Sequence, residues 1–306
     1  MTPTTPNFPP LLRDRPEAER QQWARWVLGS HSDQFLPEMA SAVEKLNRQD
    51  PIELGDPVMA PGALPNDLIV ITCKQGQHAV IVDQPLICRV VLFDWTGRGI
   101  ADSNNPQGWP VISEKTECKG QLMELAWRQL EMPPADHYVA FLDDDLCLRT
   151  SDINTILAMS RMHHLSAAQP SLTLNSPSSR EYPWLRQRAC TSLHRLPIVE
   201  NQAPFIRRDL LDLSMPFLVS TKSAYGYDRF ALPLCAAELG DWRFGAIDIA
   251  PMSHLRPLGS VEQSFSNGLK SKEEELLVRQ RLMLAMGFQV DQQAYQQLER
   301  AVGSAG

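Results

Sequence analysis

Tyr138-Val139-Ala140-Phe141-Leu142-Asp143-Asp144-Asp145 is an apolar run that ends abruptly in three adjacent carboxylates. The five apolar or aromatic residues predict a strand buried on both faces, as in the centre of an α/β sheet. Because side chains alternate across a strand, Asp143 and Asp145 should project to one side and Asp144 to the other. Two carboxylates on the same side repel each other and lose solvation. A group that balances this negative charge is therefore expected next to the carboxylates.

The sequence leaves two interpretations of the three carboxylates open. A divalent cation with oxygen ligands would relieve the repulsion, and Mg²⁺ or Mn²⁺ commonly bridges carboxylates to substrate phosphates. Alternatively, the carboxylates form a solvated acidic turn, in which Asp145 or Asp152 caps the next helix.

Other motifs with this spacing fit poorly. A calcium-binding loop starting at Asp143 needs glycine at its sixth position and glutamate at its twelfth, where this chain has Leu148 and Asn154. A phosphatase of the haloacid-dehalogenase type would resemble Asp-x-Asp-x-Thr after the first strand, but the fifth position is Cys147 and more than one strand candidate comes before it. What remains is a resemblance to the DxD-type motif of GT-A glycosyltransferases. In that motif, a metal bound after a central strand holds the diphosphate of a nucleotide sugar.

The composition is ordinary for a globular protein, with 306 residues of which 43% are hydrophobic and 21% charged. This length accommodates one large α/β domain with helical additions, or two small domains. The net charge of -7 gives no global attraction to nucleic acid or to an anionic membrane. The six cysteines are scattered without a Cys-x-x-Cys pair, and several lie in apolar runs. This pattern favours buried reduced thiols over disulfides or a zinc site.

The N-terminal residues 1–10 are rich in proline and threonine and lack the apolar segment of a signal peptide. No apolar run approaches the length that spans a membrane. We therefore expect a cytoplasmic protein without a membrane span.

The pattern along the chain predicts three parts. Residues 1–60 form an N-terminal tail and helical extension, residues 61–260 form the main domain, and residues 261–306 form a helical C-terminal extension. The predicted order of elements indicates an α/β domain with an open, mostly parallel mixed sheet flanked by helices, whose strand ends carry the site. The tail should extend to about residue 14, and the proline-rich stretch 51–65 should be a linker. We predict helices over 16–28, 33–48, 117–130, 152–163, 271–286 and 290–302, and strands over 67–73, 79–82, 86–93 and 138–142.

The acidic run 273–275 follows a capping-box pattern, Ser271-x-x-Glu274. It is expected to be a favourable charge cluster on the first turn of the helix, with no catalytic role.

Five short blocks follow one another in the chain, over residues 141–146, 168–172, 199–205, 225–228 and 254–259. Their order and spacing resemble a family of uncharacterised proteins related to GT-A glycosyltransferases, over roughly residues 65 to 260. The resemblance implies a GT-A-like fold and a reaction class, the transfer of a sugar from a nucleotide donor. It implies no particular substrate.

The resemblance implies roles for the residues around the triplet. Asp145 would ligate the cation directly, Asp143 would lie near the donor ribose or a metal-bound water, and Asp144 would support the turn. His254 would be a late metal ligand or a diphosphate contact, since neutral imidazole suits manganese beside carboxylates. We therefore assign Asp143, Asp145 and His254 to the metal, and Asp143 and Asp144 also to the donor. The alternative for His254 is a surface or capping histidine.

Asp228 is the candidate general base. Inverting sugar transfer needs a carboxylate that takes the proton of the acceptor hydroxyl. Tyr225, Tyr227 and Phe230 could form an apolar wall for a sugar ring, although Tyr225-Gly226-Tyr227 stands where the family usually has a glycine-tryptophan-glycine element. The alternative is that Asp228 caps a helix over 229–239.

Glu200 lies between apolar residues and should be partly buried and paired, with Arg207 or Arg208 as partners. It either orients an acceptor hydroxyl as a second catalytic residue or forms a structural ion pair.

Three polar residues are candidates for binding the nucleotide part of the donor. Lys74 and Asp94 follow the first strands, over whose ends a nucleotide should lie. Lys119 precedes the Asp143 strand and resembles a lysine near the diphosphate in related enzymes. An ammonium and a divalent cation together would offset the charge of the departing diphosphate. For each lysine, a solvated surface position remains the alternative.

These observations predict a glycosyltransferase that uses Mn²⁺ or Mg²⁺. It would move a sugar from a nucleotide-diphosphate donor, for example a UDP-linked one, to a hydroxyl acceptor. The transfer would invert the sugar, with Asp228 as the base. A glycan or small-molecule acceptor fits the acidic balance better than nucleic acid. Two other classes stay open. One is a nucleotide-sugar hydrolase or nucleotidyltransferase, and the other is a non-catalytic binding protein on a glycosyltransferase scaffold.

Overall fold

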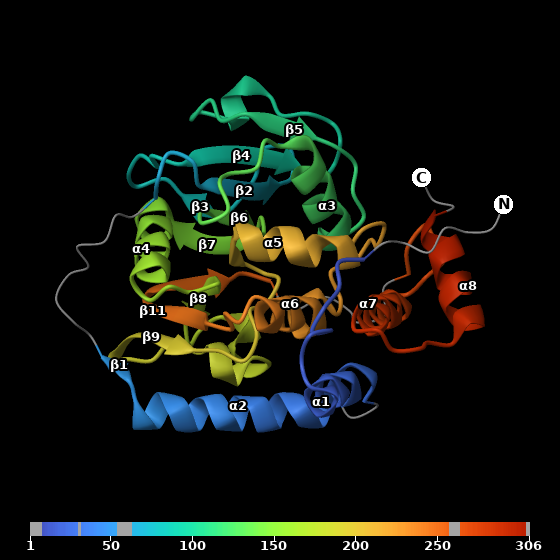
Figure 1. The fold of residues 1–306 in the computed structure, drawn as a ribbon. Coiled ribbons are helices and arrows are strands. Elements are labelled where there is room, and N and C mark those ends of the chain that lie inside the picture. The colour runs from blue at the N-terminus through green and yellow to red at the C-terminus, as the bar shows by residue number, and fades with distance from the viewer. Residues whose placement is uncertain (1–7, 30–31, 54–62, 257–263, 304–306) are drawn as a thin grey trace.

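Strand β6 (Tyr138–Leu142) lies within the central sheet with all five side chains buried, as its unbroken apolar sequence predicts. The computed structural model describes residues 8–29, 32–53, 63–256 and 264–303. Strands extend to both sides of β6, and helices pack around the sheet (Figure 1). The predicted mixed α/β sheet flanked by helices is confirmed.

Parallel strands bring their carboxyl ends to one edge of the sheet. β2 (Leu68–Cys73) pairs with β6, β4 (Arg89–Asp94) pairs with β2, and β5 (Val111–Ser113) pairs with β4. All six residues of β2 are buried, since its β-branched and leucine side chains pack on both faces. Asp94 ends β4 and Asp143 follows β6, so both residues lie at the edge where open α/β sheets bind ligands.

The strands beyond β6 make the sheet mixed. β10 (Phe205–Arg207) runs antiparallel between β6 and β8 (Ala167–Leu172). β11 (Phe244–His254) is parallel to β8, β9 (Thr191–Arg195) is antiparallel to β11, and β1 (Ile52–Glu53) pairs with β9. The sequence pattern predicted none of these strands, although β11 has 11 residues.

Three strands form a small second sheet near the edge where the parallel strands have their carboxyl ends, which we call the carboxylate edge. β7 (Leu146–Arg149) pairs with β3 (Val80–Ile81) and with the end of β11. In this pairing His254 lies opposite Leu146. The small sheet therefore brings a residue from the end of β11 next to the triplet that follows β6.

Helices cover the sheet and extend beyond it (Figure 1). α2 runs along the β9 side of the sheet, and α7 and α8 lie together at the opposite end of the view from α4. Four short 3₁₀ segments, Asp102–Asn104, Pro177–Arg180, Pro183–Leu185 and Met215–Phe217, occupy the connections. The α-helices are α1 (Glu17–Leu28), α2 (Ser32–Gln49), α3 (Lys119–Gln129), α4 (Thr150–Met162), α5 (Arg208–Ser214), α6 (Leu232–Glu238), α7 (Ser271–Ala285) and α8 (Gln292–Gly303).

Two expectations about the N-terminal part differ from the structure. Residues 1–7 of the predicted tail lie outside the described residues, but Leu11 and Leu12 are buried, and the Leu11 amide donates to the carbonyl of Ala285 at 3.2 Å. Apolar side chains in a polar tail provide the reason, because they gain stability by packing against α7. The predicted linker likewise includes β1, which joins the sheet, while residues 54–62 of that linker lie outside the described residues.

The six cysteines are free thiols, and Cys73, Cys88 and Cys235 are buried, as their apolar surroundings predict. Within the described parts of the chain, no helix combines the length and the apolar character that a bilayer crossing requires.

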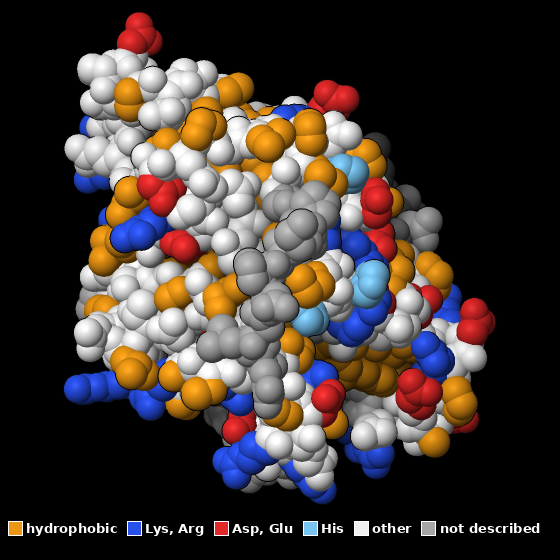
Figure 2. Space-filling model, turned by 90° about the vertical axis from the view of Figure 1, so that its left-hand side faces the viewer, with side chains coloured by type: hydrophobic (Ala, Val, Ile, Leu, Met, Phe, Trp, Pro, Cys, Tyr) orange, Lys and Arg blue, Asp and Glu red, His pale blue; other side chains and the backbone are white. Residues whose placement is uncertain are grey.

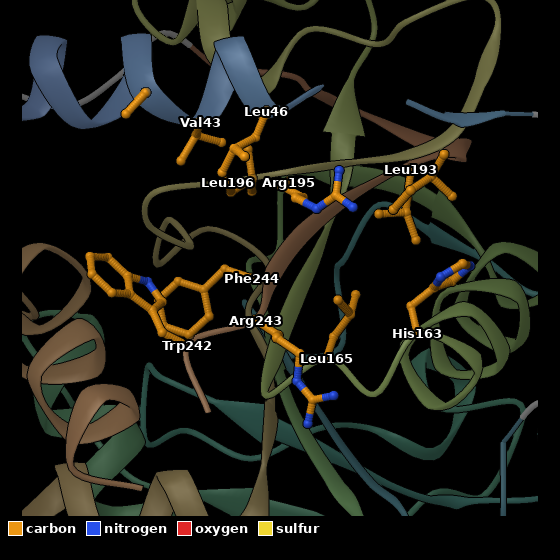
Figure 3. A pocket seen from close by; sticks show the side chains of 12 residues that line it. Val43, Leu46, His163, Leu165, Leu193, Arg195, Leu196, Trp242, Arg243 and Phe244 are labelled. Atoms are coloured by element: carbon orange, nitrogen blue, oxygen red, sulfur yellow. The ribbon is translucent and has the colours of Figure 1, made fainter. Parts of the chain in front are cut away.

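An apolar cavity lies away from the carboxylate edge. Its volume is about 550 Å³, and it lies between α2 and the β9–β11 side of the sheet, with Arg195 and Arg243 among its walls (Figure 3). The face of the molecule that carries α4 and β1 shows hydrophobic side chains gathered in a hollow, with basic side chains nearby (Figure 2). None of the predicted site residues lines the cavity.

Candidate functional site

Asp143, Asp145 and His254 come together, as the resemblance implies. Each offers one ligand atom, and these three atoms lie within 4.8 Å of one another. Asp143 and Asp145 are positioned by the end of β6, and His254 is the last residue of β11. The side chains of Asp145 and His254 are buried, and the Nε2 atom of His254 lies 3.4 Å from a carboxylate oxygen of Asp145. His254 is therefore not a surface histidine.

The charges around this cluster are partly balanced by two cations. The ammonium of Lys119 forms an ion pair with Asp143 and also donates to the carbonyl of Phe141 at 3.1 Å. The exposed guanidinium of Arg256 lies 3.7 Å from Asp145. Burial raises the pKa of Asp143, and the Lys119 ammonium opposes that rise.

The donor set fits a divalent cation. Two carboxylates and one imidazole are ligands that manganese and magnesium sites use. Ligand atoms about 2.1 Å from one ion lie at most roughly 4.2 Å apart, so a shift of a few tenths of an ångström would close the cluster. In addition, the Nδ1 atom of His254 is buried and has no hydrogen-bond partner among the described residues. A buried imidazole nitrogen of this kind needs a hydrogen-bond partner or an ion.

Asp144 lies on the other side of the strand end, as the alternation of side chains predicts. Its carboxylate accepts a hydrogen bond from the indole of Trp95 at 3.2 Å, and its carbonyl accepts one from the Ala79 amide at 2.9 Å. Trp95 follows β4, so Asp144 joins the ends of neighbouring strands. This placement agrees with a turn-supporting role.

Lys119 is the first residue of α3, and close packing at the start of this helix directs it to Asp143. A Cβ atom on Gly120 would lie 2.0 Å from the carbonyl oxygen of Ser223. The Gln121 amide donates to the carbonyl of Lys222 at 3.0 Å. The start of α3 is therefore fixed by the backbone of residues 222–223, and this contact requires glycine at position 120.

Asp94 is placed differently from the expectation. Its side chain has no exposed surface, and it accepts hydrogen bonds from the Gln75, Thr96, Arg98 and Gly99 amides and from the Ser113 hydroxyl. Direct contact with a nucleotide does not fit this placement, because the loops after β2 and β4 occupy its oxygens. Asp94 instead organises those loops, and Lys74 is exposed in the first of them.

Glu200 and Asp228 form a buried pair of carboxyl groups. The two residues are 5% and 7% exposed, and each carboxyl group affects the pKa of the other, so their titrations are coupled. Burial raises the pKa of Glu200 well above its usual value, and the neighbouring Asp228 raises it further. Burial also raises the pKa of Asp228, against the effect of Arg229.

The expected partners of Glu200 are wrong. Arg207 pairs with Asp209 and Asp241, and Arg208 pairs with Asp212. The cation beside Glu200 is Arg229, and the Tyr182 hydroxyl is a further hydrogen-bond partner. Arg207 ends β10 and Arg208 begins α5, so both arginines lie at the far end of that strand from Glu200, and the sequence did not reveal this strand.

The helix predicted at 229–239 begins earlier and in a different form. Tyr227–Ala231 form a π-helical turn that leads into α6, and Gly226, with φ of 81°, precedes it. Asp228 lies inside this turn, so it is not the helix cap. Tyr227 and Phe230 are buried in the core and provide no wall for a sugar; Tyr225 is half-buried.

Sequence reasoning missed a row of polar side chains beside Asp143. The Asp143 amide donates to the carbonyl of Gln202 at 3.2 Å. Continuing the register of β6, β10 and β8 places Gln202, Ser171 and Gln169 on the same face as Asp143. The Gln169 and Gln202 amides and the Ser171 hydroxyl each have a buried atom without a partner among the described residues. Polar residues inside the apolar strand 167–172 were the available signal.

Comparison with known proteins gives similarities of fold to solved structures. No protein-family model and no curated protein matches the sequence. S. aureus TarS 1-349, also solved with UDP-GlcNAc, is 12% identical, covering 78% of this chain and 70% of that one, with a TM-score of 0.43. GalNAc-T7 with UDP, GalNAc and Mn²⁺ is 10% identical, covering 79% and 56%, with a TM-score of 0.46.

A third similar structure is the mannosyltransferase PcManGT from Pyrobaculum calidifontis, in complex with GDP-Man and Mn²⁺. It is 12% identical and covers 93% of this chain and 80% of that one, with a TM-score of 0.43. At such identities and TM-scores, function has to be inferred from the side chains of the site.

Proposed function

We propose that this protein is a metal-dependent glycosyltransferase that moves a sugar from a nucleotide-diphosphate donor to a hydroxyl acceptor. One observation carries the proposal: Asp143, Asp145 and His254 converge at the carboxyl edge of the sheet, with Lys119 beside them. Ligands of open α/β sheets bind at this edge. A diphosphate needs cations there, and this arrangement supplies an ammonium and a ligand set for a divalent ion.

In this proposal Asp143, Asp145 and His254 hold Mn²⁺ or Mg²⁺. When bound, the ion offsets charge on the diphosphate as it departs. Lys119 lies where it can contact the same diphosphate. That contact would draw the Lys119 ammonium away from Asp143. The nucleoside lies over the loops after β2 and β4, where Lys74 is exposed and Asp94 fixes the loop backbone. Fixed charges of this kind stabilise a leaving group without reorganisation.

The buried pair Glu200 and Asp228 supports the acceptor half of the reaction. Asp228 accepts a hydrogen bond from the Arg229 amide at 2.9 Å, which favours its carboxylate form, so in this proposal Glu200 holds the proton of the pair. Asp228 takes the proton of the acceptor hydroxyl as that oxygen attacks the sugar carbon, which gives inversion. In this role Glu200 is a neighbour that orients Asp228.

Calorimetric titration with a panel of nucleoside diphosphates, with and without Mn²⁺, tests the donor site. We expect one nucleotide to bind in a metal-dependent way to the wild type and not to Asp145→Asn. Incubation of the matching nucleotide sugar with hydroxyl acceptors then tests the reaction. Acceptor-dependent transfer supports the proposal, whereas release of free sugar without an acceptor would identify a hydrolase. Absence of nucleotide binding would contradict the assignment of a donor site.

A further inference from the structure

Glu274 on α7 is a fully buried carboxylate outside the site described above. Its oxygens accept hydrogen bonds from the Lys222 amide at 2.9 Å and from the amide and hydroxyl of Ser223, both at 2.7 Å. The Asn267 amide group donates to it at 2.8 Å. The acidic run 273–275 is thus not a uniform charge cluster on a helical turn, since Glu273 is exposed while Glu274 has no exposed surface.

Residues 222–223, which Glu274 holds, form the contact that fixes Lys119. The carbonyl of Lys222 accepts from the Gln121 amide at the start of α3, and the Ser223 carbonyl packs on Gly120. Lys119 directly precedes Gly120 and Gln121 and forms the ion pair with Asp143. Displacement of residues 222–223 would therefore release the lysine from the metal cluster.

The same segment continues directly to the carboxyl pair. The carbonyl of Ala224 accepts a hydrogen bond from the side chain of Asn201 at 2.9 Å, next to Glu200. Gly226 then turns the chain into the π-helical turn that contains Asp228. Glu275, next to Glu274 on α7, packs against this glycine, since a Cβ atom there would lie 3.1 Å from its Cγ. One segment of seven residues, 222–228, therefore links Lys119 to Asp228.

The charge of Glu274 is compensated by hydrogen-bond donors. The Lys222 ammonium is directed to Glu117, 3.5 Å away, so the amides and hydroxyl are what stabilise the Glu274 carboxylate. Charge-assisted hydrogen bonds of this kind are short and strong, and a buried donor that loses its acceptor is costly. Replacing the carboxylate with an amide would place an NH₂ group against N–H donors.

We infer that Glu274 is a positioning residue. By holding residues 222–228, it fixes the position of Lys119 at the metal cluster relative to Asp228, the proposed base. The inference rests on the proposed function. It makes the C-terminal extension part of the catalytic apparatus, although α7 contributes no side chain to the metal cluster.

The test compares Glu274→Gln with Glu273→Gln, which removes a charge from the same helical turn at an exposed position. We expect Glu274→Gln to weaken Mn²⁺-dependent binding of the nucleoside diphosphate by roughly 10- to 100-fold, because the displaced Lys119 no longer makes its charged contact with the diphosphate. Glu273→Gln should leave this binding unchanged. Ser223→Ala, which deletes one of the donors to Glu274, should weaken it in the same direction by a smaller factor, and it serves if Glu274→Gln does not fold.

Hydrogen exchange of residues 119–123 gives a readout independent of metal and turnover. Exchange of the Gln121 amide should accelerate in Glu274→Gln and Ser223→Ala but not in Glu273→Gln. A lower unfolding temperature with unchanged exchange and unchanged nucleoside diphosphate binding would overturn the inference, because it would mean a purely structural role. If the wild type binds no Mn²⁺, the proposed function fails, and the exchange result alone decides whether Glu274 positions α3.

Discussion

Glu200 and Asp228 are neighbouring buried carboxyl groups that affect each other's pKa, although 27 residues of intervening sequence separate them. Glu200 follows β9 and Asp228 lies in the π-helical turn before α6. Arg229 and Tyr182 are the further polar groups that face Glu200. Two carboxyl groups that interact in this way lose their protons in coupled steps. Such a pair costs stability, which is typical of a functional site.

Asp228→Asn tests the base directly. A general base contributes roughly 10²- to 10⁴-fold to a rate, so we expect kcat to fall by about that factor while Mn²⁺ and donor nucleotide bind as before. Steady-state kinetics and nucleotide titration measure the two effects. Asp136→Asn, at an exposed carboxylate, is the control. Unchanged kcat in Asp228→Asn would exclude this carboxylate as the base.

Glu200→Gln should stabilise the protein at neutral pH. The pKa of Glu200 lies above its usual 4.5 in the folded protein, so the unfolded chain loses this proton at a lower pH than the folded chain does. Stability then falls as pH rises above about 4.5, and glutamine removes this loss. We expect the unfolding temperature of the variant to exceed that of the wild type at pH 7 to 8, and the difference to shrink towards pH 4. A difference independent of pH would show that Glu200 is not protonated more readily in the folded state.

The sequence predicted β2 and β6, but not β7 and β11, among the strands near the metal cluster, because the burial of β2 and β6 is complete. β2 and β6 are largely apolar runs, which predict buried strands. The three carboxylates directly after β6 are not needed by a buried strand, so they indicated a site. The placement of His254 came from a resemblance in the order of short blocks. The structure supplies the physical link, since β7 pairs with the end of β11.

The sequence could not reveal contacts made by backbone atoms. Glu274 is indistinguishable from its neighbours Glu273 and Glu275 in the sequence, and its burial depends on the amides of residues 222–223. The hydrogen bonds that Asp94 accepts from loop amides were likewise not visible in the sequence. Short strands such as β10 carry too few residues for periodicity to register.

Asp145→Asn should abolish metal-dependent nucleotide binding and leave the fold intact. An amide is a weaker, neutral ligand, and Asp145 lies next to His254 in the cluster. Asp136→Asn is the control, because its carboxylate is exposed and precedes β6, at the opposite end of that strand from the cluster. Circular dichroism and Mn²⁺ titration compare the variants. Wild-type Mn²⁺ binding in Asp145→Asn would contradict the assignment of the metal site.

Asp94→Asn should destabilise the loops after β2 and β4. Burial alone would raise the pKa of Asp94, but hydrogen bonds from Thr96, Gln75 and Ser113 outweigh it and lower the pKa to about 2. A lowered pKa adds stability above the unfolded value of 3.8, and that stability is lost as pH falls towards 2. The shift corresponds to roughly 2 kcal/mol. Denaturation at pH 7 and pH 3 should show a large loss for the variant at pH 7 and a smaller one at pH 3, whereas an equal loss at both would mean that the carboxylate charge is irrelevant.

Gly120→Ala should disturb the metal site from the start of α3. The added Cβ would lie 2.0 Å from the Ser223 carbonyl oxygen and 2.5 Å from its carbon, and backbone atoms cannot rotate away. α3 must therefore separate from residues 222–223, which removes the Gln121 hydrogen bond and draws Lys119 away from Asp143. Overpacking costs typically 1 to 3 kcal/mol, and we expect about 3 kcal/mol here because backbone is involved.

Gly303→Ala is the matched control for this substitution. Gly303 ends α8, and a Cβ atom there meets nothing within 4 Å among the described residues. The helix preference of alanine should make this variant neutral or more stable by up to about 1 kcal/mol. Urea unfolding and Mn²⁺ titration of both variants provide the comparison. If Gly120→Ala unfolds and binds Mn²⁺ as Gly303→Ala does, then α3 does not depend on its contact with residues 222–223, and Lys119 is held at Asp143 by the ion pair alone.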